Sequence, residues 1–178
     1  MKKNVLVYGL ISGALISAFI VISMNVWGCE GNASSMYIGY AAQLLALSLV
    51  FVGIKNYRDN YNGGVISFGK AFTMGLYISL IASTMYVVVW TIDYYYFMPD
   101  FMDKFAASML KQAQSSHLSP AQLASKTAEI AEMKKIYASP IMVFLFTYVE
   151  ILPTGLIVSL ISALILKKKA GGDGVVVA

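Results

Sequence analysis

The chain has 178 residues, of which 58% are hydrophobic and only 12% are charged, with a mean hydropathy of +0.70. Soluble domains carry roughly 25% charged residues, so the composition excludes an ordinary soluble globule and indicates a membrane protein. A chain of this length has room for one helical bundle and one modest soluble excursion, but not for a separate catalytic domain. With one cysteine and one histidine, we expect no internal disulfide, no metal site and no cofactor.

Four apolar stretches are long enough to cross a bilayer, which takes about 20 helical residues. They lie at about 5–27, 36–54, 70–97 and 141–166. The first follows Lys2 and Lys3 and looks like a secretory signal, but its apolar run is too long, so we interpret it as a retained span. The sequence therefore predicts an all-α fold, an integral membrane four-helix bundle within residues 1–169, with a polar loop from Lys55 to Gly64 and a flexible tail at 170–178.

The one sizeable soluble segment, 99–139, predicts an amphipathic helical hairpin between the third and fourth spans. Asp100 and Asp103 favour the positive start of a first helix. Ser119 and Gln122, with Pro120 between them, supply an N-cap, a capping-box partner and a first-turn proline for a second helix. We expect the two helices to fold back on each other or to lie on the membrane surface.

The distribution of Lys and Arg predicts the orientation. With both termini in the cytoplasm, the inner side holds eight basic against two acidic residues, and the outer side holds five of each. Positive charge in short flanks favours the cytoplasmic side. The hairpin is therefore expected in the periplasm of a bacterial inner-membrane protein. The basic residues fall at helix ends rather than on one soluble patch, which argues against nucleic-acid binding.

Small residues spaced four apart predict where the spans pack, because close approach of helices in lipid depends on such positions. Three spans carry such a ridge on one face, and Ala42 and Ala46 offer a weaker one on the second span. The three ridges are Gly9, Gly13 and Ser17; Gly75, Ser79 and Ser83; and Gly155, Ser159 and Ala163.

Glu150 is the most informative polar residue, because it lies near the middle of the last span, where a charge costs roughly 2.5–3.5 kcal/mol on insertion scales. Pro153 removes a backbone donor one turn away and predicts a kink. Two interpretations remain open. Glu150 could serve a proton- or cation-linked function, or it could be a protonated acid that holds the bundle together, with Tyr86 on the third span as its predicted partner.

Other candidate residues lie nearer the membrane surfaces. Asp93, one turn inside the outer boundary, is interpreted as an interface anchor, with a functional role as the alternative. Lys70 is expected to extend to the inner headgroups. The neighbouring Tyr57, Arg58 and Asp59 are candidates for lipid or partner contact, and a local ion pair in a solvated loop is the simpler interpretation.

Enzyme motifs are missing from the sequence. It contains no Ser-His-Asp set, no metal-ligand spacing, no phosphate-binding loop and no dinucleotide glycine pattern. An intramembrane pair of acids would need matching depths, whereas Asp93 and Glu150 are expected about two helical turns apart. We therefore predict that the chain is not an enzyme.

Four stretches resemble a bacterial membrane family catalogued as domain of unknown function 4199. They are residues 53–59, 63–72, 99–102 and 150–157, and the most specific part runs from Tyr57-Arg58-Asp59 to Gly69-Lys70-Ala71-Phe72. The resemblance covers roughly residues 1–169. It implies a bacterial inner-membrane protein with four helices, but no activity and no catalytic residues.

Two functional hypotheses follow from the sequence. The first is a non-enzymatic interaction or structural subunit that associates with itself or with another membrane protein. The alternative is a small proton-linked secondary transporter that uses Glu150 and, with only four spans, works as an oligomer. In both cases the surrounding partner is the lipid bilayer.

Overall fold

A computed structural model gives the fold, and it describes residues 1–27, 33–116 and 118–168. The predicted flexible tail at 170–178 lies outside the described residues. The elements in chain order are α1 (Lys2–Trp27), α2 (Ala33–Leu47), α3 (Leu49–Tyr61), α4 (Phe68–Ile92), the π-helical turn η1 (Asp93–Phe97), α5 (Phe101–Ser115), α6 (Pro120–Tyr137) and α7 (Pro140–Leu166).

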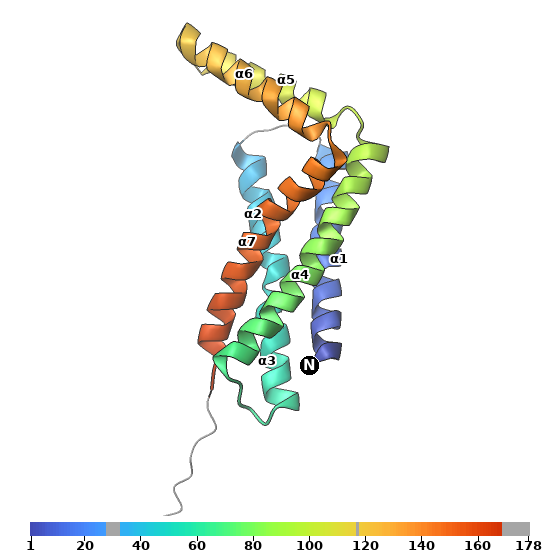
Figure 1. The fold of residues 1–178 in the computed structure, drawn as a ribbon, viewed down its shortest axis with the longest axis vertical. Helices are drawn as coiled ribbons and strands as arrows, with labels where there is room; N and C mark the ends of the chain where they lie inside the picture. The colour runs from blue at the N-terminus through green and yellow to red at the C-terminus, as the bar shows by residue number, and fades with distance from the viewer. Residues whose placement is uncertain (28–32, 117, 169–178) are drawn as a thin grey trace, which may run out of the picture.

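Four helical segments are long and apolar enough to cross a membrane: Lys2–Asn25, Tyr37–Tyr61, Phe68–Phe97 and Pro140–Leu166. They run alongside one another as a bundle, and α5 and α6 lie at one end of it (Figure 1). The described part of the chain contains no β-strand beyond an isolated bridge between Ile66 and Lys168. The predicted all-α architecture with four membrane-length helices is thus confirmed.

The second span differs from its predicted form at its inner end. The helix does not stop at Ile54 but continues as α3 to Tyr61, so the prediction of a loop beginning at Lys55 is wrong. The reason is amphipathicity, because Tyr57 is buried while Lys55 and Asp59 are exposed. The chain then turns at Gly63 and Gly64, where φ is 62° and 76°, values that glycine adopts readily.

The most extensive contact between the described spans joins α4 and α7 and uses the predicted small residues. A Cβ on Gly75 would lie 2.8 Å from that of Ser159, and a Cβ on Gly155 would lie 2.8 Å from that of Ser79. The Ser79 hydroxyl donates to the carbonyl of Gly155 at 3.1 Å. Two of the three predicted ridges therefore face each other, and their pairing fixes the relative depth of the two helices.

The third ridge packs on the other side of α4. Gly9 lies against Ile81 and Gly13 against Met85 and Ala82, which sets α1 parallel to α4. The Ser12 hydroxyl donates to the Ala46 carbonyl at 2.7 Å and ties α1 to α2. Neighbouring helices follow the order α1, α4, α7, α3 around the bundle, so α1 and α7 occupy opposite corners.

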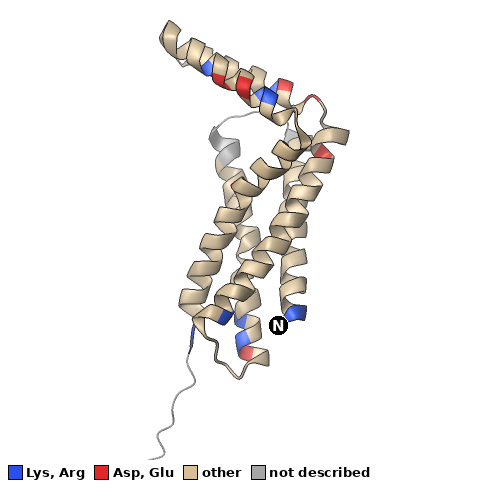
Figure 2. Cartoon of the chain, viewed as in Figure 1, with Lys and Arg blue, Asp and Glu red and all other residues tan. Residues whose placement is uncertain are grey.

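The hairpin of α5 and α6 is attached to the bundle at its base. Phe101 and Met102 are buried against Trp90 and Tyr94 in one aromatic cluster, and the rest of the hairpin extends away from the bundle axis (Figure 1). The Ser119 capping box is present as predicted. Acidic and basic residues are mixed along the hairpin, whereas mostly basic residues gather at the opposite end of the molecule (Figure 2).

The α4–α7 contact makes a direct prediction for stability. Replacing Gly75 with Ala inserts a methyl group 2.8 Å from the Ser159 Cβ, so the helices must separate. We expect a loss of about 1–3 kcal/mol, the usual cost of overpacking, measured by thermal or denaturant unfolding in detergent micelles.

Gly39→Ala is the matched control, because a Cβ at Gly39 in α2 meets no atom within 4 Å. Both substitutions raise helix propensity by about 1 kcal/mol, so the difference between the two variants isolates the packing effect. Equal stability of the two variants would contradict the packing described for α4 and α7.

Candidate functional site

Glu150 lies near the middle of α7, the last of the four membrane-length helices. It is the eleventh residue of the helix Pro140–Leu166, and at about 1.5 Å per residue it lies about 15 Å from the helix start. The contacts of Gly75 with Ser159 and of Ser79 with Gly155 set the register between α4 and α7. Continued toward the start of α7, that register places Glu150 level with Thr84 on α4, whose hydroxyl forms a hydrogen bond with the hydroxyl of Tyr148.

The side chain of Glu150 is exposed on the surface of this single chain. The next residue, Ile151, is almost completely buried and faces α4. Successive helical residues differ by about 100° in direction, so Glu150 sits at the flank of the buried face. Within the part of the chain that the structure describes, its carboxyl has no hydrogen bond and no ion pair.

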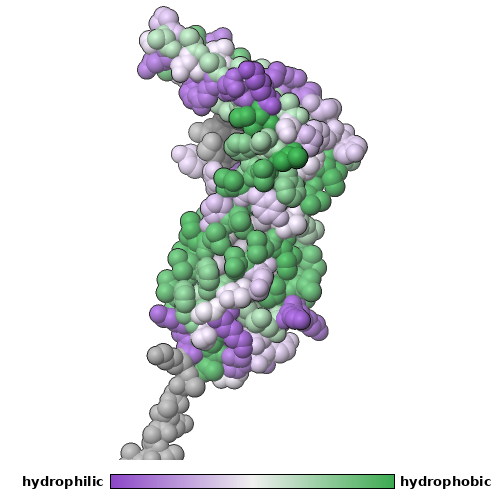
Figure 3. Space-filling model, in the orientation of Figure 1, coloured by the Kyte–Doolittle hydropathy of each residue, from purple (hydrophilic) through white to green (hydrophobic). Residues whose placement is uncertain are grey.

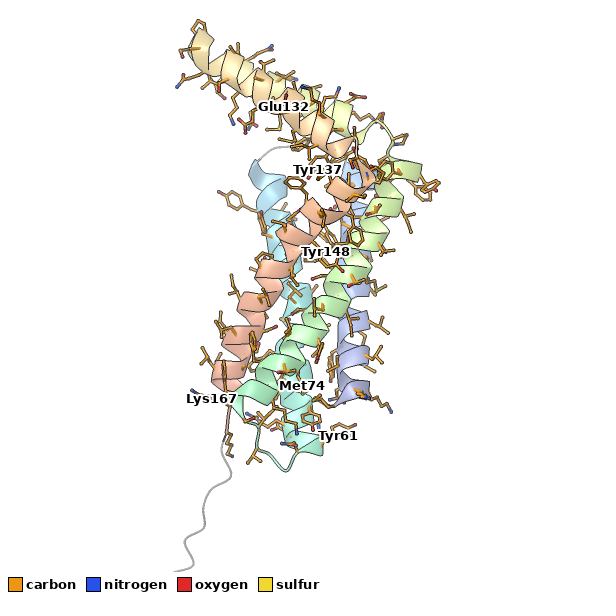
Figure 4. All side chains as sticks on the ribbon, viewed as in Figure 1. Tyr61, Met74, Glu132, Tyr137, Tyr148 and Lys167 are labelled. Carbon is orange, nitrogen blue, oxygen red and sulfur yellow. The ribbon has the colours of Figure 1, made fainter. Side chains whose placement is uncertain are left out.

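Tyr86, the predicted partner of Glu150, is buried and only about half a helical turn from its level. The Glu150 carboxylate lies within electrostatic reach of the Tyr86 hydroxyl, but the described residues show no hydrogen bond between the two. The Glu150 carboxylate also interacts electrostatically with Tyr137. Tyr137 is the last residue of α6 and lies at the end of the hairpin that meets the bundle (Figure 4). Burial, and after it the charge of Glu150, raise the pKa of Tyr137.

Pro153 lies inside α7 one turn below Glu150. Figure 1 shows the helix changing direction between its upper and lower halves, as expected when a proline removes a backbone hydrogen bond. Beside the bend, a shallow apolar groove of about 210 Å³ is lined by Tyr148, Val149, Leu152, Pro153 and Leu156. The exposed acid and this groove border the same outer face of α7.

That outer face is otherwise apolar. Figure 3 shows hydrophobic residues over most of the helices between the polar hairpin and the polar opposite end, with a band of weakly polar residues across the middle. Around Glu150 the exposed large side chains on α7 are Phe146, Val149 and Ile157. We call the exposed surface formed by Phe146, Val149, Glu150, Pro153 and Ile157 the α7 face.

A layer of buried polar groups at the same depth was not identified from the sequence. Ile16, Ala46, Tyr86, Val87 and Ile151 pack together and join four helices. Flanking this cluster along the helices are three polar atoms that are buried without a described hydrogen-bond partner: Ser17 Oγ, Gln43 Nε2 and Ser83 Oγ. Gln43 is the informative one, since an amide in an apolar span is a signal that sequence reasoning could have used.

Asp93 begins the π-helical turn at the end of α4 and is 4% exposed, so its side chain is buried against the protein. Its interpretation as an interface anchor stays a prediction. The Asn25 amide donates to its Oδ1 at 3.4 Å, and its Oδ2 has no partner among the described residues. Trp90 and Tyr94 are buried too, packed on Phe101 with ring centroids 5.2 and 5.8 Å away.

At the opposite end of the bundle, the structure brings Tyr57 and Lys70 together. The Lys70 ammonium lies 5.0 Å from the centre of the Tyr57 ring and donates to Asn62 Oδ1 at 2.9 Å. Cation–π contacts of this kind contribute about 0.5–1 kcal/mol at exposed sites. Lys70 therefore holds the turn between α3 and α4.

Arg58 and Asp59 form a local ion pair, the simpler of the two interpretations of these residues, with Nε and Oδ1 2.6 Å apart. A second nitrogen of Arg58, Nη1, donates to the carbonyl of Leu166 at the end of α7. Next to it, Ile66 and Lys168 exchange two backbone hydrogen bonds of 3.0 and 2.9 Å. The α3–α4 loop is thereby tied to the carboxyl end of α7.

This end of the bundle yields a second prediction. Arg58→Gln removes a cation from the last carbonyls of α7, where positive charge is favoured. We expect a loss of roughly 1 kcal/mol in stability and faster amide hydrogen exchange at residues 166–168, measured by mass spectrometry.

Lys55→Gln is its control, since Lys55 is exposed on the same helix and the substitution removes the same charge. Unchanged exchange at the end of α7 in Arg58→Gln would show that the Arg58–Leu166 bond is not formed in lipid.

The described residues contain no group of three or more His, Cys, Asp or Glu side chains placed to hold a metal ion. The structure thus defines an all-α protein with four membrane-length helices and an unpaired acid on the surface of the last one. Residues 7–168 match the family described as "Protein of unknown function (DUF4199)", and the chain belongs to that family. No curated protein and no solved structure matches the chain.

Proposed function

We propose that this protein is a non-enzymatic interaction subunit of a membrane, which associates with another membrane-embedded chain through the α7 face. The observation that carries the proposal is the environment of Glu150. Its side chain lies near the middle of a membrane-length helix, is exposed on the surface of the single chain and has no hydrogen-bond or ion-pair partner among the described residues.

The energetics support a protein partner rather than lipid on this surface. A carboxylate at the bilayer centre costs roughly 2.5–3.5 kcal/mol on insertion scales, and acids in spans usually face protein or water. Hydrogen bonds between helices relieve part of such a cost, about 0.6 kcal/mol on average and up to about 1.7. Transport, the alternative from the sequence, is less well supported because the Glu150 side chain is exposed on the surface of the chain.

We further propose that the membrane is a bacterial inner membrane, with both termini in the cytoplasm. Lys2, Lys3, Lys70 and the basic residues near the end of α7 gather at one end of the molecule (Figure 2). Such an excess of basic residues in short flanks favours the cytoplasmic side. The hairpin of α5 and α6 then extends into the periplasm, where its balanced charge suits an aqueous environment.

The interaction is tested by placing a photo-activated crosslinking amino acid at Val149, in the α7 face, in native membranes. We expect a protein adduct, because Val149 is 70% exposed next to the acid that needs a partner. The control position is Leu15 on α1, which is 53% exposed, has a similar depth and lies at the opposite corner of the bundle. Adducts with lipid alone at Val149, or equal protein adducts at both positions, would reject the proposed interaction surface.

The orientation is tested with reporter fusions in the turn at Gly63 and at Ser116 near the tip of the hairpin. We expect a cytoplasmic reporter to be active at Gly63 and a periplasmic reporter at Ser116, because the basic residues flank the former. The opposite pattern would invert the orientation.

A further inference from the structure

We propose that the partner on the α7 face is a second copy of this chain, and that the two Glu150 carboxyl groups meet across a twofold axis normal to the membrane. The inference rests on the proposed function and names its partner. It starts from the unpaired, exposed Glu150 carboxyl.

Depth is the first argument for a second copy. Two identical chains inserted in the same orientation hold Glu150 at the same height, and a twofold axis places equivalent residues opposite one another. Each Glu150 carboxyl therefore faces the Glu150 carboxyl of the second copy, and no other polar residue is needed in the partner. A different protein would need its own hydrogen-bonding group at that depth in a span.

The chemistry of the carboxyl group is self-complementary. A protonated carboxyl has one O–H donor and further acceptor capacity, so two such groups satisfy each other, and one proton shared between two carboxyls removes their repulsion. The described residues that approach Glu150 from its own chain include the hydroxyls of Tyr86 and Tyr137 but no cation. Nothing described within one chain therefore neutralises the acid.

The shape of the α7 face suits a parallel helix pair. The bend at Pro153 and the shallow groove between Val149, Leu152 and Leu156 make the α7 face uneven. Helices pack by inserting side chains into such depressions. Val149 and Ile157 are exposed on either side of Glu150 along the helix. In the second copy the same residues are available to fill the groove.

Disulfide crosslinking between copies tests the dimer. Cys29 is the one cysteine of the chain, so single cysteines are introduced into a Cys29→Ser background at Val149 and, separately, at Ile157. Full-length protein in native membranes is oxidised with a membrane-permeant copper complex. We expect a disulfide-linked homodimer for both variants and none for Leu15→Cys, the exposed position at the opposite corner of the bundle.

Substitution of Glu150 then tests the role of the carboxyl. In the Val149→Cys protein, Glu150→Leu should lower the association constant of the dimer roughly 3- to 20-fold, the range that interhelical hydrogen bonds in membranes account for. Glu150→Gln should retain the dimer, because an amide pair also donates and accepts. Retention by Gln together with loss by Leu separates hydrogen bonding from misfolding.

Two results would overturn the inference. Crosslinking at Val149 and Ile157 that is no stronger than at Leu15 would mean that no second copy occupies the α7 face. If the photo-crosslinker at Val149 nevertheless captures a protein, the proposed interaction stands and its partner is a different chain. A dimer of undiminished strength in Glu150→Leu would show that the carboxyls do not hold it together.

Discussion

The interlock of Gly75 and Ser79 with Gly155 and Ser159 determines the arrangement of the bundle. In lipid, helices gain little from hydrophobic burial against one another, and close packing at small residues takes its place. These four residues bring α4 and α7 together and fix how far one is displaced along the other. This register sets the position of Glu150 along the bundle relative to the buried polar side chains of Ser17, Gln43 and Ser83. It also determines which side of α7 is left uncovered.

The register leaves Glu150 without a hydrogen-bond or ion-pair partner among the described residues. Ile151 is buried and Glu150, the next residue, is exposed, so the carboxyl sits where the bundle surface meets its surroundings. Asp93 is the contrasting case, since it is buried and has at least the Asn25 amide as a donor. The membrane-length helices therefore hold one acid, Asp93, that is buried among the helices and one, Glu150, that is exposed on the surface of α7.

The sequence predicted those features that depend on local pattern. Glycine and serine spacing identified the packing ridges, and Ser119 with Gln122 identified the start of α6. It failed where the outcome depends on which neighbour covers a residue. The polar residues from Lys55 onward are typical of a loop, and only the burial of Tyr57 against the bundle shows that they form the exposed face of a helix. Composition likewise could not tell that Asp93 would be enclosed, or that Glu150 would lie at the flank of α7.

Solid-state NMR of the protein in lipid bilayers tests the central claim most directly. With glutamate side chains labelled, four residues give carboxyl signals: Glu30, Glu129, Glu132 and Glu150, and Glu150→Gln identifies the intramembrane one. The account predicts a Glu150 signal typical of a hydrogen-bonded carboxyl, with magnetisation transfer from protein protons of a neighbouring chain. Transfer only from lipid acyl chains, or from a partner within the same chain, would contradict it.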